Sequence, residues 1–314
     1  MLTVLYRHRH RKGTAVQTSR RPIAPRRPAE TVDSTSDPVV HQDGLRGPTR
    51  ALLMLFGALT ALAVVALFGG SGRTDEAFAW TIQPPLSAAF LGAGYASGCL
   101  LVLLTLRAGT WRQARWPLAT ILVFAVLTLV ATLVHLDRFH LPGDTPLATA
   151  AAWFWLVVYV VVPVGMAVVM VDEERRARQH RTGAPPQTRQ PWWFAGSLRV
   201  QGLLLGVAGL ALFLGVDRVV SGWPWALTPL VAKVTAAWLL AFAVAAVMAV
   251  REDVAQLGPA SAGYLVFGAG QLLAVAVHHG DVAWGGAAAT YLVVAAWVTL
   301  TGAAGLLLGL RDGR

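Results

Sequence analysis

The chain has 314 residues, of which 55% are hydrophobic and only 13% charged, and its mean hydropathy is positive at +0.56. A soluble domain carries about 25% charged residues, so the composition excludes an ordinary soluble protein and indicates a polytopic α-helical membrane protein. A net charge of +10 would indicate a nucleic-acid partner in a soluble chain, but here the basic residues flank apolar runs and nucleic acid is not the expected partner.

The first 50 residues hold ten Lys or Arg residues, several prolines and no long apolar run. A secretory signal peptide would need an apolar region soon after a short basic start, so residues 1–50 are predicted to be a disordered basic cytoplasmic tail. The positive charge either retains the N-terminus inside the cell or contacts anionic lipid or nucleic acid. The residues available for such a contact are Arg7, Arg9, Arg11 and Lys12.

Eight apolar runs follow, each roughly as long as the 20 residues that a helix needs to cross about 30 Å of hydrocarbon. They lie at 51–70, 86–106, 118–136, 147–171, 198–216, 228–250, 260–278 and 286–310. The expected fold is all-α, a polytopic bundle of eight transmembrane helices. Residues 172–197 are predicted to be a cytoplasmic linker between 51–171 and 198–314, and its first residues, a charged run, suit a helix that extends past the membrane.

The basic residues predict the orientation of the bundle. With the tail in the cytoplasm, 22 Lys or Arg residues fall on the cytoplasmic side and three (Arg73, Arg138 and Arg218) fall outside. This asymmetry predicts that both termini are cytoplasmic, an N-in, C-in topology. Tryptophans are expected in interfacial belts. The outer belt would be Trp80, Trp223, Trp225 and Trp284, the inner one Trp111, Trp116, Trp192 and Trp193, with Trp153, Trp155, Trp238 and Trp297 packed between spans.

The second half of the chain repeats the first. The matches, at offsets of 145 and then 144 residues, are Arg73 with Arg218, Trp80 with Trp225, segment 135–137 with 279–281, and segment 151–156 with 295–300. Because each half has four spans, both halves enter the membrane in the same direction. The sequence therefore predicts two parallel four-helix repeats related by a pseudo-twofold axis along the membrane normal. Convergence on a common membrane pattern is the alternative.

Histidine and aspartate gather at the predicted outer ends of spans three and seven. The candidates for a metal or proton site are His135, Asp137, His140, His278, His279 and Asp281. If the axis brings these ends together, their nitrogen and oxygen atoms could bind a divalent cation such as Zn²⁺ or pass protons. The alternative is that they are polar residues facing water. The single cysteine, Cys99, excludes an intrachain disulfide and a cysteine-based metal site.

Polar residues follow one face of the same two spans. Thr128 and Thr132 lead toward His135, and Tyr264 and Gln271 lead toward His278. A lipid-facing glutamine is unfavourable, so Gln271 is expected to point into the bundle. The stripes either line a pore or supply hydrogen bonds between helices.

Lys233 is the one charged residue placed inside a predicted span. Such a residue is costly in the membrane and often functional. It lies one turn past Pro229, however, so its ammonium could instead reach the outer surface or Asp217.

Two segments resemble uncharacterised multi-spanning membrane proteins of actinobacteria, to which no activity is assigned. They are 135–163, with its Trp153-Phe154-Trp155 run, and 222–230, with Gly222-Trp223-Pro224-Trp225. The resemblance implies a bacterial plasma membrane location and carries over no functional residue.

Three functions stay open on the sequence. The first is a small-solute or cation permease, motivated by the repeat and the His/Asp-rich outer ends. The second is an accessory subunit that binds partner proteins, in a homo- or hetero-oligomer. The third is an enzyme acting on a lipid-linked substrate at the outer leaflet with His135 or His279 as base. No phosphate-binding loop, zinc-protease motif or serine triad is recognisable, so an enzyme is not favoured.

Overall fold

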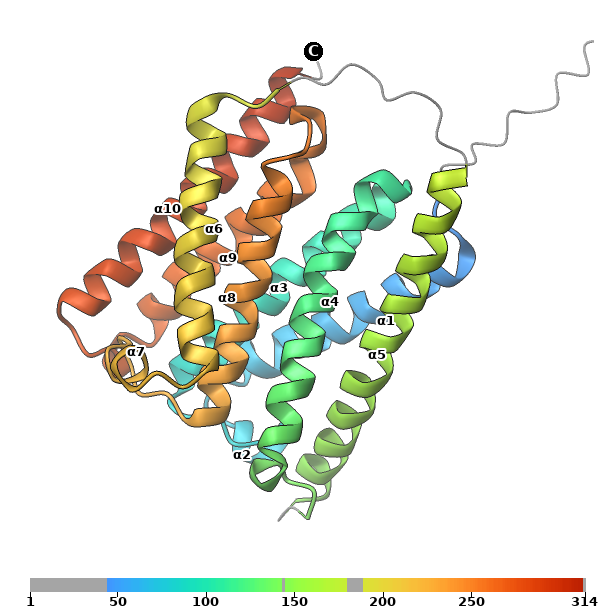
Figure 1. Ribbon diagram of the computed structural model, residues 1–314. Coiled ribbons are helices and arrows are strands. Elements are labelled where there is room, and N and C mark those ends of the chain that lie inside the picture. The colour runs from blue at the N-terminus through green and yellow to red at the C-terminus, as the bar shows by residue number, and fades with distance from the viewer. Residues whose placement is uncertain (1–43, 143–144, 180–188, 313–314) are drawn as a thin grey trace, which may run out of the picture. The chain divides into compact units, whose positions relative to one another are not determined.

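The computed structural model describes residues 44–142, 145–179 and 189–312. Within these ranges eight helices are long and apolar enough to cross a membrane, as the sequence predicts, and the chain is an all-α polytopic membrane bundle (Figure 1). They are α1 (Gly47–Val64, continued by a π-helical turn, Val65–Gly69), α3 (Pro85–Ala108), α4 (Trp111–Val134), α5 (Pro146–Gln179), α6 (Trp192–Phe213), α8 (Pro229–Ala249), α9 (Gly258–Val277) and α10 (Gly286–Asp312).

Short helical turns connect several of the spans. They are α2 (Thr74–Ala77), η2 (Leu136–Arg138), α7 (Asp217–Ser221), η3 (Val254–Gln256) and η4 (His279–Asp281). Residues 1–43 of the predicted basic tail and residues 180–188 of the predicted linker lie outside the described ranges. The described parts differ from the prediction because α1 begins at Gly47, inside the predicted tail, while α5 continues to Gln179 and α6 begins at Trp192, inside the predicted linker.

Proline and capping residues explain where several spans begin. Pro85 and Pro229 each stand in the first turn of their helix, where a missing backbone N–H is no loss. The Thr228 side chain also accepts a hydrogen bond from the backbone N–H of Val231, which caps α8. At the other end of α3, Gly109 adopts a positive φ of 71° and closes the helix.

Two helices lie at the centre of the bundle. Of the most apolar stretch of each span, 78% is buried in α8 and 67% in α3, compared with 28% in α1, α5 and α10. α3 packs against α1 and α9, while α8 packs against α6 and α4. The two predicted halves therefore interlock through α3–α9 and α4–α8 contacts and do not form separate bundles.

The peripheral helices present an apolar surface suited to lipid. α5 exposes the side chains of Val157, Val161, Val164 and Val168, which are all about half exposed or more. Exposed apolar side chains on a membrane helix contact the acyl chains of the bilayer. Contact with the lipid bilayer, the first predicted partner, follows from this surface.

Corresponding helices of the two halves bury corresponding positions. In α1 and α6, Leu53 and Leu198 are both buried, as are Leu67 and Leu212, at the predicted offset of 145. In α4 and α9, buried pairs such as Phe124 with Phe267 lie 143 residues apart. The same offset of 143 relates η2 to η4 and makes His278, not His279, the counterpart of His135.

The predicted offset of 144, which pairs segment 135–137 with 279–281 and segment 151–156 with 295–300, is therefore one residue larger than the offset seen in the structure. His278 and His279 stand in tandem, so a comparison of residue identities alone can select either one. The structure decides between them because His135 and His278 each cap the C-terminus of a span.

Several tryptophans lie elsewhere than the sequence predicts. Trp80 and Trp225 were expected at the outer interface, yet they are 1% and 2% exposed. Loop hydrogen bonds cover them: the N–H of His140 donates to Ala79 O at 3.0 Å, and that of Ala283 donates to Pro224 O at 2.8 Å. The further displaced residues are Trp111 and Trp116, which are also buried, and Trp153, which is 53% exposed rather than packed between spans.

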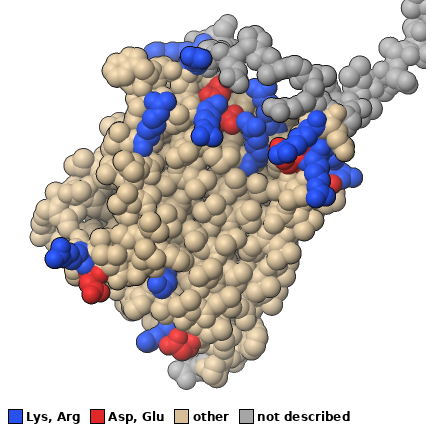
Figure 2. All heavy atoms as spheres, viewed as in Figure 1, with Lys and Arg blue, Asp and Glu red and all other residues tan. Residues whose placement is uncertain are grey.

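Charged side chains gather at one end of the bundle, as Figure 2 shows. We call this the basic end; its residues include Arg46, Arg107, Arg112, Arg115, Arg176, Arg178 and Arg251. The opposite end, with the turns η2 and η4 and the short helices α2 and α7, is called the histidine end. Its described basic residues are Arg73, Arg138, Arg218 and Lys233.

Candidate functional site

The structure distributes the predicted histidines and aspartates over several places. His278 Nε2 lies 3.2 Å from Ser71 Oγ, which joins the end of α9 to the loop after α1. Asp281 Oδ2 accepts a hydrogen bond of 3.0 Å from the backbone N–H of Leu86 and so caps the first turn of α3. Both contacts join the second half of the chain to the first.

The other members of the predicted cluster have separate surroundings. His140 Nε2 lies 3.2 Å from Thr81 Oγ1, and its Nδ1 lies 3.0 Å from Phe78 O. Asp137 forms an exposed salt bridge of 3.0 Å with Arg138. The backbone carbonyl of His279 accepts hydrogen bonds from Trp284 Nε1 and from the backbone N–H of Val282. Among the described residues, no group of three or more His, Cys, Asp or Glu could hold a metal ion, so the geometry adds no support to the predicted cation site.

His135 lies near Lys233. Burial lowers the pKa of the His135 imidazole, and the positive charge of Lys233 lowers this pKa further. Of the adjacent charges, Asp137 raises it and Arg138 lowers it. The His135 Nε2 atom is buried and has no hydrogen-bond partner in the described part of the chain.

Lys233 caps a helix. Its Nζ donates a hydrogen bond of 2.7 Å to the carbonyl of Phe213, the last residue of α6, and lies 5.5 Å from the centre of the Phe213 ring. A cation at a helix C-terminus meets unpaired carbonyls and the negative end of the helix dipole. The predicted contact with Asp217 is not formed.

The predicted polar stripes mostly join helices. Tyr264 Oη donates to Phe242 O at 3.0 Å, which ties α9 to α8. Thr132 Oγ1 accepts from Trp155 Nε1 at 3.1 Å, which ties α4 to α5. The Thr128 hydroxyl is buried and unpaired within the described ranges. Gln271 differs from these residues because it lines a cavity.

The cavity, of about 440 Å³, lies in the second half of the chain at the histidine end. Figure 1 shows α6 and α10 diverging toward α7, and the cavity lies between these helices, with α9 and α3 behind it. Its volume falls in the range of small-molecule sites. The lining residues that matter below are Phe90, Arg218, Phe267, Gln271, Tyr291 and Val298.

The cavity has a buried floor and an exposed rim. Phe90, Phe267 and Val298 form part of the floor and are at most 4% exposed. Arg218 and Thr290 are exposed lining residues on the rim, from α7 and α10. α6 and α10 are peripheral spans and contribute the exposed lining residues Leu204, Ala287 and Thr290, so the cavity lies at the periphery of the bundle and not at its centre.

Large aromatic side chains fill the corresponding region of the first half. Trp155 stacks on Tyr159 with ring centres 4.3 Å apart and meets Trp80 edge to face at 4.8 Å. At the offset of 143, the counterparts of Trp155 and Tyr159 are Val298 and Gly302. Of these two, only Val298 lines the cavity, where it leaves room that the indole of Trp155 fills in the first half, whereas Gly302 packs against α9.

One polar pair interrupts the apolar wall. Tyr291 Oη donates to Gln271 Oε1 at 2.8 Å, and Gln271 Nε2 donates to Phe90 O at 3.2 Å. An amide nitrogen carries two hydrogens, so one N–H of Gln271 stays available to a molecule in the cavity. Gln271 is 2% exposed and lies below the rim.

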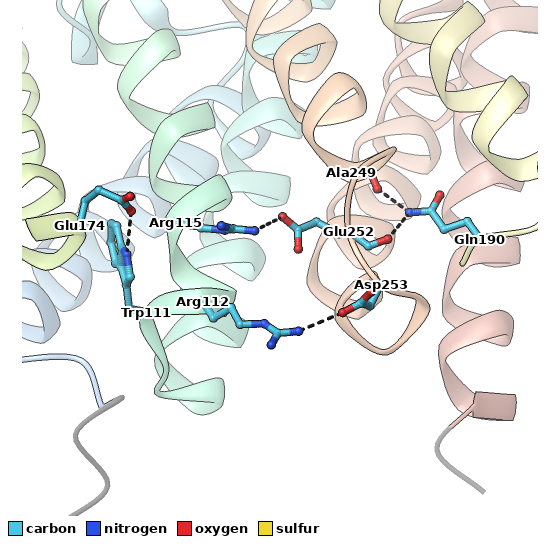
Figure 3. A network of polar contacts seen from close by, with 8 residues as sticks. All are labelled: Trp111, Arg112, Arg115, Glu174, Gln190, Ala249, Glu252 and Asp253. Atoms are coloured by element: carbon cyan, nitrogen blue, oxygen red, sulfur yellow. Dashed lines mark hydrogen bonds and ion pairs between the residues drawn. The ribbon is translucent and has the colours of Figure 1, made fainter. Parts of the chain in front are cut away.

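A separate polar network lies at the basic end, seen in Figure 3. Arg112 and Arg115 of α4 form salt bridges of 2.9 and 2.8 Å with Asp253 and Glu252, which follow α8. Gln190 Nε2 donates to the backbone carbonyl of Glu252 at 2.7 Å. These contacts join the two halves, and each of the four charged side chains has an oppositely charged partner, so the network is structural, although Gln190 Oε1 is buried without a partner in the described part of the chain.

Sequence reasoning singled out Gln271 but missed Arg218 and Tyr291 as its neighbours in the cavity. One signal for the cavity was present in the sequence: Val298 stands where the first half has Trp155. This pair is recognised only with the offset of 143 seen in the structure. Comparison of the chain with protein-family models, with curated proteins and with solved structures finds no match.

Proposed function

We propose that this multi-pass membrane protein binds the apolar chain of a lipid-like molecule in the cavity between α6 and α10. The observation that carries the proposal is an apolar cavity of about 440 Å³ lined by the peripheral spans α6 and α10. A molecule already dissolved in the bilayer enters such a site without crossing water.

Shape and polar contacts supply the selectivity of this site. Bilayer acyl chains are as apolar as the cavity wall, so removal from water contributes little to binding within the membrane. Close packing against Phe90, Phe267 and Val298 and the free N–H of Gln271 are the features that distinguish one chain from another.

We further propose that the protein lies in a bacterial plasma membrane with its basic end in the cytoplasm. The concentration of arginine at that end supports this orientation. The histidine end and the cavity then lie toward the outer leaflet.

Two parallel four-helix repeats are part of the same proposal. The shared burial pattern of α1 with α6 and α4 with α9 supports it, as do the exchanged contacts α3–α9 and α8–α4. A twofold axis along the membrane normal would generate each contact of such a pair from the other.

Binding is better supported than permeation. Tyr264 and Thr132, two of the five predicted pore-lining residues, use their polar groups to join helices. The cavity lies at the periphery of the bundle, where a membrane-dissolved molecule arrives. Transport of a small solute or cation remains a prediction of the sequence.

Filling the cavity tests the proposal. The substitution Val298→Trp places in the second half the residue that occupies the corresponding position of the first. We expect the purified wild-type protein to carry bound lipid in native mass spectrometry, and Val298→Trp to lower its occupancy about tenfold, which corresponds to about 1.4 kcal/mol.

The matched control is Val293→Trp, on the same helix but with a side chain that is 67% exposed. It adds the same indole outside the cavity, so the bound lipid should remain. Equal occupancy in wild type and Val298→Trp, with both variants folded by thermal melting, would refute binding in this cavity.

A further inference from the structure

We propose that the molecule in the cavity is an acidic phospholipid of the leaflet at the histidine end, with its phosphate at Arg218. This inference rests on the proposed function and adds the chemical class of the ligand. Two observations support it: Arg218 lies on the rim of the cavity, and the hydrogen-bonded pair Gln271–Tyr291 lies below the rim.

Arg218 is a cation with no carboxylate partner among the residues that the structure describes. It lines the cavity from α7, its side chain is exposed, and it forms no salt bridge with any residue that the structure describes, including the adjacent Asp217. A guanidinium presents paired N–H donors that match phosphate oxygens. An anionic head group therefore complements the rim.

The other described cations of the histidine end are placed differently. Arg138 pairs with Asp137, and Lys233 caps α6. Arg73 occupies the position 145 residues before Arg218 and is likewise exposed, but it does not line this cavity. The rim of the cavity thus carries positive charge through Arg218.

Below the rim, Gln271 and Tyr291 provide a second polar point. The free N–H of Gln271 can donate to an acceptor, and the Tyr291 hydroxyl oxygen keeps a lone pair after donating to Gln271. A phospholipid carries an ester carbonyl between its phosphate and its chain. Phosphate at Arg218, carbonyl at Gln271 and chain against Phe267 follow the order of groups along the cavity.

The experiment measures lipid preference in the full chain. Purified protein is delipidated and offered phosphatidylglycerol and phosphatidylethanolamine with identical acyl chains, and bound lipid is counted by native mass spectrometry. Both lipids carry a phosphate, but the ammonium group of phosphatidylethanolamine offsets its negative charge at Arg218. We therefore expect wild type to prefer the acidic lipid about twofold to fivefold, the range that an exposed ion pair gives. The preference should shrink at high ionic strength because Arg218 is exposed.

Substitutions assign the preference to its residue. Arg218→Gln should bind both lipids about equally, Arg218→Lys should keep most of the preference, and Arg73→Gln should behave as wild type. A wild-type protein without preference, or an Arg218→Gln variant that keeps it, would overturn the inference.

Failure of this inference can be told apart from failure of the proposed function. If Val298→Trp removes both lipids while Arg218→Gln changes nothing, the cavity binds a chain and the head-group assignment is wrong. If Val298→Trp removes neither lipid, the cavity itself is not the binding site and both proposals fall.

Discussion

At the scale of single residues, the cost of burying a polar group predicted the surroundings of Gln271 but not its role. The amide was expected to avoid lipid, and it is 2% exposed. Its partners, Phe90 O and Tyr291, could not be predicted, because they belong to helices whose rotation about their axes the sequence does not specify. The same reason explains why Lys233 reaches Phe213 and not Asp217.

His135 should make the stability of the protein depend on pH. Because burial and Lys233 lower its pKa in the folded state, the unfolded state binds its proton more readily. Stability should therefore fall as the pH drops below the ordinary histidine value of about 6.5. Thermal melting in detergent between pH about 7.5 and 5 measures this slope.

Two variants check the assignment to His135. His135→Gln should flatten the slope, because the group that titrates is removed. Lys233→Met should flatten it in part, because the pKa of His135 then moves back toward its ordinary value. An unchanged slope in both variants would contradict this origin.

At the scale of helices, the number of spans could be predicted and their ends could not. All eight spans follow from apolar runs long enough to cross a bilayer. The ends differ because hydropathy marks the membrane boundary, whereas a helix can continue beyond it. α4 begins at Trp111 and includes the polar run 112–115, and α5 continues to Gln179 through the charged run predicted to extend it.

The contact between α9 and α10 depends on glycine. A Cβ atom on Gly302 would lie 2.3 Å from the backbone nitrogen of Leu265. This distance is a steric clash, and a backbone atom cannot move aside as the end of a flexible side chain can. We expect Gly302→Ala to force the two helices apart and to lower the melting temperature, at a cost within the 1–3 kcal/mol typical of overpacking.

Gly309 provides the control on the same helix. A Cβ there would lie 3.7 Å from Val254 O, an ordinary contact. Alanine favours a helix over glycine by about 0.8–1 kcal/mol, so Gly309→Ala should hold or raise the melting temperature. Similar losses in both variants would show that the α9–α10 distance does not limit stability.

At the scale of the whole molecule, charge predicts an orientation that accessibility can measure. Cys99 is the single cysteine, so a Cys99→Ala background has no thiol. Arg138 and Arg178 lie at opposite ends, with side chains 69% and 73% exposed. In intact bacterial cells, a membrane-impermeant maleimide should label Arg138→Cys, and it should label Arg178→Cys only after lysis. The reverse pattern would invert the topology.

The sequence predicts the proposed repeat, whereas it does not predict the cavity. Identities such as Trp80 with Trp225 relate the halves, but a cavity is a difference between them. Finding the cavity requires the correct residue-by-residue alignment of the two halves. Because His278 and His279 stand in tandem, the alignment based on sequence identities is wrong by one residue. At the structural offset, Trp155 opposite Val298 is the informative pair.

The interlocked packing of α3 on α9 and of α4 on α8 limits how the chain can be divided. A polypeptide that ended after α5 would leave the inner faces of α3 and α4 without their partners. Two such fragments could cover one another by exchanging these contacts, as a homodimer of half-length chains. Under the proposed duplication, the covalent link between the halves would free each half to diverge, so that the second opened a pocket at Val298 while the first kept Trp155 at the corresponding position.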